Sequence, residues 1–175
     1  MKNFVRTEDA APYLSTRAKK LSIPKNGLVK EEEDAIIATA MEILKNRMKE
    51  PGEAMISPDC VRNYLKLKLT GYDYELFYVL FLDNQHCLIH SEVMFRGTID
   101  SSSVYPREVA TKCLELSAKK VIFAHNHPSG LSEHSKADVD ITKKLEQALG
   151  LFDIGVLDHF IVGRTIYSMK ENGVI

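Results

Sequence analysis

The stretch VIFAHNHPSGLSEHSKADVD, residues 121–140, constrains the fold of this chain more than any other segment. Its pattern predicts a buried strand, a tight loop and the first turns of a helix. A strand places the side chains of residues i and i+2 on one side of the backbone, so His125 and His127 face the same way. Two imidazoles that leave an apolar strand side by side are suited to bind one transition metal.

Asp138 lies eleven residues beyond His127, at the start of the predicted helix. Ile141, Leu145 and Ala148 follow it at i+3, i+7 and i+10, the spacing of the buried stripe of an amphipathic helix. A carboxylate at the head of such a stripe is costly unless it is paired or binds a cation. We therefore expect Asp138 to join the two histidines as a third metal ligand, which leaves the fourth position of a zinc site to water.

Ser135 precedes Asp138 by three residues, the spacing of a capping box. In this arrangement Ser135 is the N-cap of the helix, and Asp138 at N3 accepts a hydrogen bond in return. The alternative is that these two residues only cap a helix while the histidines only fill a pocket. We favour the metal site, because the HxH pattern, the Ser-x-x-Asp pattern and a carboxylate on the buried face occur together.

A hydrolytic zinc site also needs a base that takes a proton from water and returns it to the leaving group. Glu75 directly precedes an apolar segment that we expect to be a strand, and Glu92 lies inside its predicted partner strand. Glu108 lies in the first turn of a helix that Pro106 begins, where unpaired N–H groups stabilise an acid. Position alone leaves this choice open, and an exposed carboxylate at a strand end is the alternative interpretation of Glu75.

These motifs resemble those of the RadC family. The resemblance is carried by HNHPSG, Ser135-x-x-Asp138, Thr142, and LDH at 157–159 with Gly163. The spacing His-x-His-x7-Ser-x2-Asp is also that of the wider JAMM (MPN+) metalloproteases. GTI at 97–99 and VYPREV at 104–109 fit the same family, and the similarity extends from about Glu32 to the C-terminus.

The resemblance implies a cytidine-deaminase-like α/β fold of the MPN type, a three-layer sandwich around a mixed β-sheet. It implies that His125, His127 and Asp138 hold Zn²⁺. It also implies a catalytic glutamate just before an apolar strand that follows a helix, a context that only Glu75 matches. Ser135 would then hydrogen-bond the oxyanion of the reaction. The implied activity is zinc-dependent hydrolysis of a peptide or isopeptide bond in a peptide or protein substrate.

Two features near the motif are not explained by it. The family usually has a proline just before the motif serine, and this chain has His134 there, so we expect a looser loop and a third imidazole near the metal. Asp158 and His159 either support a ligand by hydrogen bonding or form an ordinary buried pair. The sequence does not decide between these two interpretations, and we do not count His159 as a ligand.

At 175 residues the chain has room for one domain of ordinary size and an extension. We expect residues 1–30 to be a flexible extension, since residues 15–30 hold five basic side chains and no acid. Two helices are expected in residues 31–70, packed on the core. The JAMM catalytic domain is expected to occupy residues 71–175.

The composition is that of a soluble globular protein, with 45% hydrophobic and 27% charged residues. A net charge of −1 gives no general attraction to nucleic acid, so nucleic-acid binding is an alternative that charge does not indicate. Three widely spaced cysteines favour a reduced, cytoplasmic protein. No apolar run approaches the roughly 20 residues of a membrane span, and the oligomeric state stays open.

Two other classes of function compete with hydrolysis. One is an MPN scaffold that binds partners without cleaving them, although the complete ligand set argues against it. The other is a DNA-repair or mobile-element role, the historical association of RadC-like proteins, exerted through nucleic acid or partner binding. Longer family members carry an N-terminal helix-hairpin-helix region, and we expect none in the about 30 residues before the first predicted helix.

Overall fold

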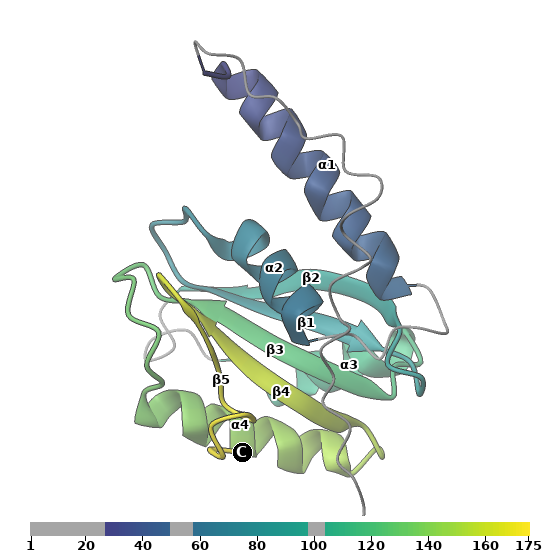
Figure 1. Cartoon of the computed structure of the whole chain (residues 1–175). Helices are drawn as coiled ribbons and strands as arrows, with labels where there is room; N and C mark the ends of the chain where they lie inside the picture. Colours follow the sequence, from purple (N-terminus) through teal and green to yellow (C-terminus); the bar gives the residue numbers. More distant parts are fainter. Residues whose placement is uncertain (1–26, 50–57, 98–103) are drawn as a thin grey trace, which may run out of the picture. The chain divides into compact units, whose positions relative to one another are not determined.

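A computed structural model of the chain describes residues 27–49, 58–97 and 104–175 (Figure 1). In chain order the helices and strands are α1 (Lys30–Lys49), α2 (Pro58–Leu69), β1 (Leu76–Leu82), β2 (Leu88–Arg96), α3 (Pro106–Glu115), β3 (Lys120–Asn126), α4 (Lys136–Gly150), β4 (Gly155–Val162) and β5 (Ile166–Ser168). The chain divides into two units, residues 1–36 and 37–175, and the sheet lies entirely in the second.

The five strands form one mixed sheet in the order β2-β1-β3-β4-β5. β1 pairs antiparallel with both β2 and β3, whereas β3 and β4 are parallel and β5 returns antiparallel to β4. The parallel pair is joined by α4, the crossover helix that a parallel connection requires. This order places β3, which carries the two histidines, in the centre of the sheet.

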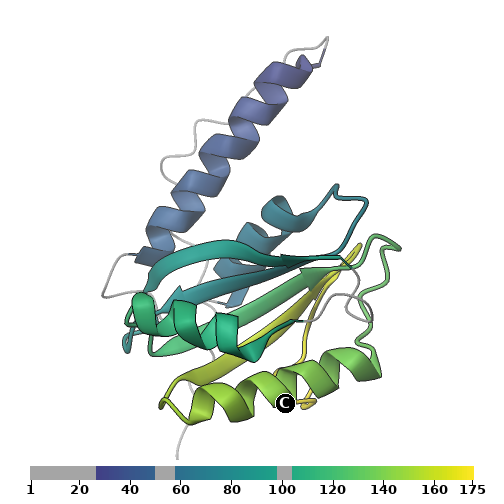
Figure 2. The ribbon, with the colours of Figure 1, turned by 180° about the vertical axis from the view of Figure 1, so that it is seen from behind.

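Helices cover both faces of the sheet, as Figures 1 and 2 show from opposite sides. On one face α2 packs with Met48, near the end of α1, against the sheet. On the other face α3 and α4 pack side by side. The predicted three-layer α/β sandwich with a mixed sheet is therefore confirmed.

β1 is buried along its whole length. Phe77, Val79 and Phe81 point toward α3 and α4. The alternate residues Leu76, Tyr78, Leu80 and Leu82 point toward α2. The apolar run LFYVLFL thus belongs to a central strand with two buried faces, which explains why it lacks the alternation of a half-exposed strand.

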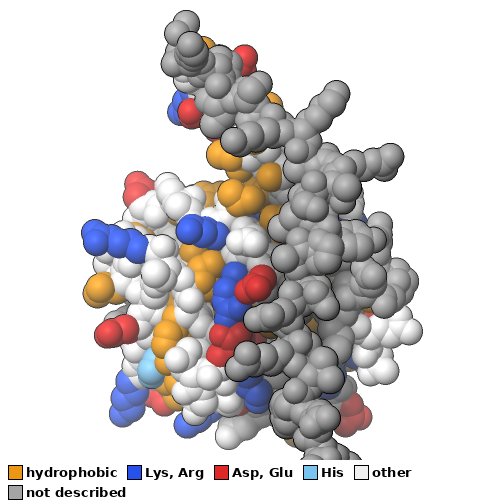
Figure 3. Space-filling view, viewed as in Figure 1, with side chains coloured by type: hydrophobic (Ala, Val, Ile, Leu, Met, Phe, Trp, Pro, Cys, Tyr) orange, Lys and Arg blue, Asp and Glu red, His pale blue; other side chains and the backbone are white. Residues whose placement is uncertain are grey.

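Some predicted segments fall outside the described residues, namely most of the N-terminal extension (residues 1–26) and Thr98 with Ile99 of the GTI motif. In the part of the chain that the structure describes, no helix has both the length and the apolarity to cross a membrane. On the coloured part of the face in Figure 3, Lys and Arg side chains lie among Asp and Glu side chains. Arg62 of α2, for example, pairs with both Asp59 and Glu171.

Replacing Leu80 by alanine should lower the free energy of unfolding by about 2–5 kcal/mol, because it leaves a cavity at the centre of the sheet. Leu80 is 0% exposed, whereas Leu114 on α3 is 53% exposed. Leu114→Ala is the matched control and should change stability by no more than about 0.5 kcal/mol. Urea unfolding measures both, and equal losses would contradict this description of the core.

Candidate metal centre

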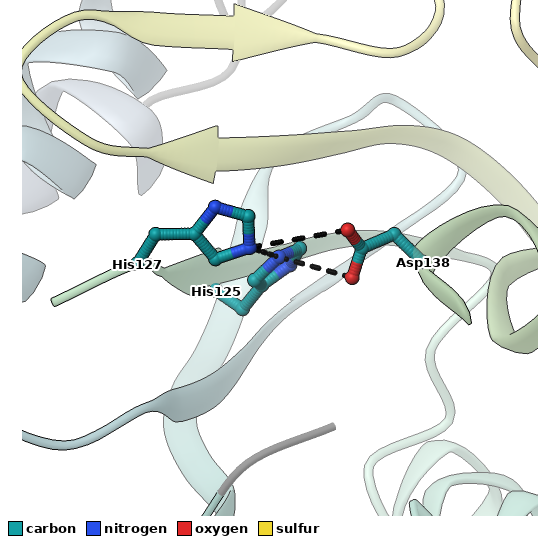
Figure 4. A group of neighbouring side chains, drawn as sticks. All are labelled: His125, His127 and Asp138. Atoms are coloured by element: carbon teal, nitrogen blue, oxygen red, sulfur yellow. Dashed lines mark hydrogen bonds and ion pairs between the residues drawn. The ribbon is translucent and has the colours of Figure 1, made fainter. Parts of the chain in front are cut away.

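Two histidines reach the site from the end of β3 (Figure 4). His125 is completely buried, while His127, one residue beyond the strand, is 16% exposed at its side chain. Their Nε2 atoms lie 2.9 Å apart. Two unprotonated ring nitrogens at this separation repel each other through their lone pairs, and a cation bound between them relieves this repulsion.

Asp138 reaches the same point from the first turn of α4. Ser135 is the N-cap of this helix, and the predicted capping box is confirmed. Asp138 N donates to Ser135 Oγ at 3.1 Å, and Ser135 N donates to Asp138 Oδ2 at 2.7 Å. The box fixes the direction of the carboxylate, because Oδ2 is held by the backbone and Oδ1 is turned toward the histidines.

The buried face of α4 differs slightly from the predicted one. Its fully buried residues are Asp138, Thr142, Leu145 and Leu149. Ile141 and Ala148, which the sequence placed on the inward stripe, are only half-buried. The shift is about one residue around the helix, and it brings the polar Thr142 rather than Ile141 into line behind Asp138.

The three side chains converge on one point. His125 Nε2 lies 3.2 Å from Asp138 Oδ1, and His127 Nε2 lies 3.9 Å from Oδ2. One ligand atom from each residue lies within 4.8 Å of the other two. Ligand atoms around a tetrahedral zinc ion with bonds of 2.0–2.1 Å are separated by about 3.3 Å, so the spacing suits such an ion.

The surroundings of the Asp138 carboxylate also favour a bound cation. Its Oδ1 atom is buried and accepts no hydrogen bond from any described residue. The neighbouring His125 Nε2 lies at 3.2 Å without forming one. Leaving a buried carboxylate oxygen without a partner costs more than about 1–3 kcal/mol. Two imidazoles and a carboxylate are a donor set that zinc accepts, so the residues fit a bound metal.

His127 is oriented by the loop that follows it. Its Nδ1 lies 3.0 Å from Leu131 O, and because a carbonyl only accepts, Nδ1 carries a proton and Nε2 is the ring nitrogen left to bind a metal. The loop rests on the β4–β5 turn at Gly163. A Cβ added to Gly163 would lie 2.6–2.7 Å from Gly130 O, Leu131 O and Ser132 Oγ, so only glycine allows this approach.

His125 is oriented by a second buried histidine. His125 Nδ1 lies 2.8 Å from His159 Nε2, and His159 Nδ1 lies 2.6 Å from Thr142 Oγ1. Burial lowers the pKa of His125 from its ordinary value to about 4; the Asp138 carboxylate opposes this shift and His127 adds to it. Burial also holds the pKa of His159 well below its ordinary value, with a further contribution from the two neighbouring imidazoles. Both rings are therefore neutral at physiological pH.

Asp158 and His159 point to opposite sides of β4. Asp158 accepts hydrogen bonds from Lys170 N at 3.0 Å and from Ser168 Oγ at 2.5 Å, so it fastens the end of the chain to the sheet. His159 alone contacts a candidate ligand. Of the two interpretations that the sequence left open, support of a candidate ligand by hydrogen bonding applies to His159. Asp158 has a structural role instead.

Glu75 lies immediately before β1, and the bond from Gly97 N to Glu75 O, 3.0 Å, extends the β1–β2 ladder to it. Phe77 pairs with His125 across β1 and β3, so the two share a face of the sheet. Strand alternation places Glu75, two residues earlier, on that face and near His127. Glu75 is half-buried.

The two other candidate bases have charged partners elsewhere. Glu92 of β2 lies 3.2 Å from Lys112 Nζ on α3. Glu108 is exposed in the first turn of α3 and lies 2.9 Å from Arg107 Nε. Neither belongs to the cluster of converging ligand atoms.

Asn126, between the two histidines, has a role that the sequence did not reveal. Strand alternation turns its buried side chain away from the metal site, where Oδ1 accepts from Leu76 N at 2.8 Å and Nδ2 donates to Tyr74 O at 2.9 Å. It therefore clamps the backbone on both sides of Glu75. In the sequence, a polar side chain at the end of a predicted buried strand was the indication of such a role. The partners of that side chain depend on the pairing of β1 with β3.

His134 lies outside the converging cluster. Its ring is exposed and stacks on Tyr167 of β5, with the two ring centroids 5.4 Å apart. The expectation that His134 loosens the loop and adds an imidazole near the metal is therefore wrong, because its ring packs the loop against the last strand.

Residues 55–174 match the RadC-like JAB domain. A UPF0758 protein of Vibrio cholerae is 50% identical over 141 residues, which are 81% of this chain and 89% of the relative.

The chain belongs to the RadC family.

Other relatives of this RadC-family chain are longer than it is. A UPF0758 protein of Marinobacter nauticus is 47% identical over 145 residues, which are 81% of this chain and 65% of the relative. One of Photobacterium profundum is 50% identical over 140 residues and is covered over 62% of its length. The chain thus spans a little under two thirds of these two proteins. The family membership agrees with a JAMM-type fold that carries a possible His-His-Asp metal site.

Gly163→Ala should weaken metal binding by about 10- to 100-fold, because the new Cβ displaces the loop and with it the carbonyl that orients His127. Gly150→Ala is the matched control, since a Cβ there meets nothing within 4 Å. Competition with a chromophoric chelator measures both affinities. Equal affinities in the two variants would show that the close approach at Gly163 does not orient the ligand.

The metal-free protein should lose stability on acidification from about pH 6.5 to about pH 4. In this window the unfolded chain protonates the histidine at position 125, whereas burial keeps His125 neutral in the folded state. The unfolded state then binds more protons, so the free energy of unfolding falls by about 3 kcal/mol across the window. Urea unfolding in the presence of a chelator measures it, and constant or rising stability would contradict the burial of a neutral His125.

Proposed function

We propose that this chain is a zinc-dependent metallohydrolase of the JAMM type that cleaves a peptide or isopeptide bond. The observation that carries the proposal is the meeting of His125, His127 and Asp138, with Asp138 Oδ1 buried and without a hydrogen bond among the described residues. Membership of a family with a JAB domain supports it. When bound there, a zinc ion acts as a Lewis acid that activates water near neutral pH and polarises a carbonyl.

Glu75 is the proposed general base and acid. It takes a proton from the attacking water and later gives it to the leaving nitrogen. Its place on the face that carries His125 supports this role, as does the Asn126 clamp, which fixes the backbone at Tyr74 and Leu76. A base whose backbone is held on both sides needs little reorganisation when substrate binds.

Ser135 is the proposed donor to the oxyanion that forms at the scissile carbonyl. Its hydroxyl oxygen accepts from Asp138 N at 3.1 Å, so capping occupies a lone pair and leaves the hydroxyl proton to donate. Because the same cap holds Asp138, the donor and the ligand are set in one rigid turn of α4.

A pocket beside His127 offers space for the substrate. Its volume is about 360 Å³, and it lies between the segment that follows α2 and the β4–β5 turn. Asp73 and Arg164 line it together with His127. Both charges and several backbone groups are thus within reach of a peptide that approaches the exposed side of His127.

Glu75→Gln should retain stoichiometric zinc but lose turnover by about 10²- to 10⁴-fold, since a carboxamide cannot take up the proton. His127→Ala should lose zinc. Metal content by mass spectrometry and turnover on peptide and isopeptide substrate libraries measure the two effects separately.

Glu108→Gln is the control for the same substitution at an exposed glutamate, and it should keep both zinc and turnover. Turnover that survives in Glu75→Gln would assign the base to another residue. A wild-type chain that binds no zinc when titrated would contradict the proposed function as a whole.

A further inference from the structure

We propose that Thr142 and His159 form a hydrogen-bond relay that holds His125 in the tautomer whose Nε2 lone pair faces the metal site. The relay begins at the backbone carbonyl of Asp138 and ends at His125 Nδ1. It makes Thr142 and His159 positioning residues for metal binding. The inference rests on the proposed function only in taking His125 as a metal ligand.

The direction of the relay follows from its first member. Thr142 Oγ1 lies 2.5 Å from Asp138 O and 2.6 Å from His159 Nδ1. A hydroxyl has one proton, and a carbonyl oxygen can only accept, so Thr142 donates to Asp138 O. The oxygen of Thr142 must then accept from the other neighbour, which places a proton on His159 Nδ1.

The next step fixes both imidazoles. His159 is neutral with its proton on Nδ1, so its Nε2 is an acceptor, and His125 Nδ1 at 2.8 Å must donate to it. The neutral His125 ring therefore has no proton on Nε2. This is the nitrogen that lies 3.2 Å from Asp138 Oδ1 and 2.9 Å from His127 Nε2.

The surroundings prevent water from substituting for the relay. His125, Thr142 and His159 are each 0% exposed. The His159 ring stands edge-on to Phe77 and Phe123, with ring centroids at 5.6 and 5.9 Å. Among the described residues no carboxylate is hydrogen-bonded to the His159 ring, and an imidazolium between two aromatic rings would be costly to bury, so His159 stays neutral.

The reverse direction of these hydrogen bonds would prevent metal binding. If Thr142 donated to His159, then His159 would donate to His125 Nδ1 and His125 would carry its proton on Nε2. That proton would point into the metal position and would have to leave before a metal could bind. One helix thus supplies a ligand through the Asp138 side chain and sets the tautomer of another through the Asp138 carbonyl.

The test replaces the hydroxyl without changing the size of the side chain. Thr142→Val leaves His159 Nδ1 facing a methyl group, where an acceptor lone pair is tolerated better than an unpaired N–H, so the relay reverses. Zinc affinity should fall by about 10- to 100-fold. Thr142→Ser keeps the hydroxyl and should bind zinc within a few-fold of wild type. Thr111→Val, at an exposed threonine of α3, is the matched control and should have no effect.

A second measurement needs no metal. Long-range ¹H–¹⁵N spectra of the metal-free full chain, labelled at histidine, report which ring nitrogen carries the proton. The wild type and Thr142→Ser should show His125 protonated at Nδ1. Thr142→Val should show a shift of that proton toward Nε2.

The outcomes separate the relay from the proposed function. Nε2 protonation of His125 in the metal-free wild type overturns the relay, and so does unchanged zinc affinity in Thr142→Val. Equal zinc loss in Thr142→Val and Thr142→Ser also overturns it, since packing and not the hydroxyl would then be responsible. A wild type that shows the Nδ1 tautomer but takes up no zinc supports the relay and contradicts the hydrolase proposal.

Discussion

Three acceptor atoms meet in a buried place, and the structure around them depends on how their mutual repulsion is relieved. His125 and His127 present ring nitrogens 2.9 Å apart, and Asp138 adds a buried oxygen that no described residue satisfies. Burial of so many acceptors is unfavourable unless a positive charge joins them. The sheet, the capped helix and the loop each hold one of these atoms in place, so the fold preserves an arrangement that a bound cation would stabilise.

The site is assembled at the end of the central strands of the sheet. β3 lies between β1 and β4, and this order brings residues distant in sequence to one point. Glu75 immediately precedes β1, His159 lies on β4, and Asp138 and Thr142 lie on α4. The candidate metal ligands therefore depend on supporting residues from the neighbouring strands and from α4, as is typical of metal sites in proteins.

Much of the fold and part of the site were predictable from the sequence because they follow from local periodicity. The period of a strand places His125 and His127 together, and the period of a helix turns Asp138 inward. The roles of Asn126 and Thr142 were not predictable in this way. Asn126 hydrogen-bonds to residues about fifty positions earlier, so its role depends on the register of β1 against β3. Thr142 hydrogen-bonds to His159 on β4, so its role depends on how α4 packs against the sheet. The predicted buried face of α4 is wrong by about one residue around the helix. The prediction followed the apolar residues and did not allow for a buried threonine.

Anomalous diffraction at the zinc absorption edge, from crystals of the full chain grown with zinc, tests the central claim most directly. We expect one ion within about 2.0–2.2 Å of His125 Nε2, His127 Nε2 and an Asp138 carboxylate oxygen. An ion bound elsewhere, or one that contacts fewer than these three residues, would contradict it.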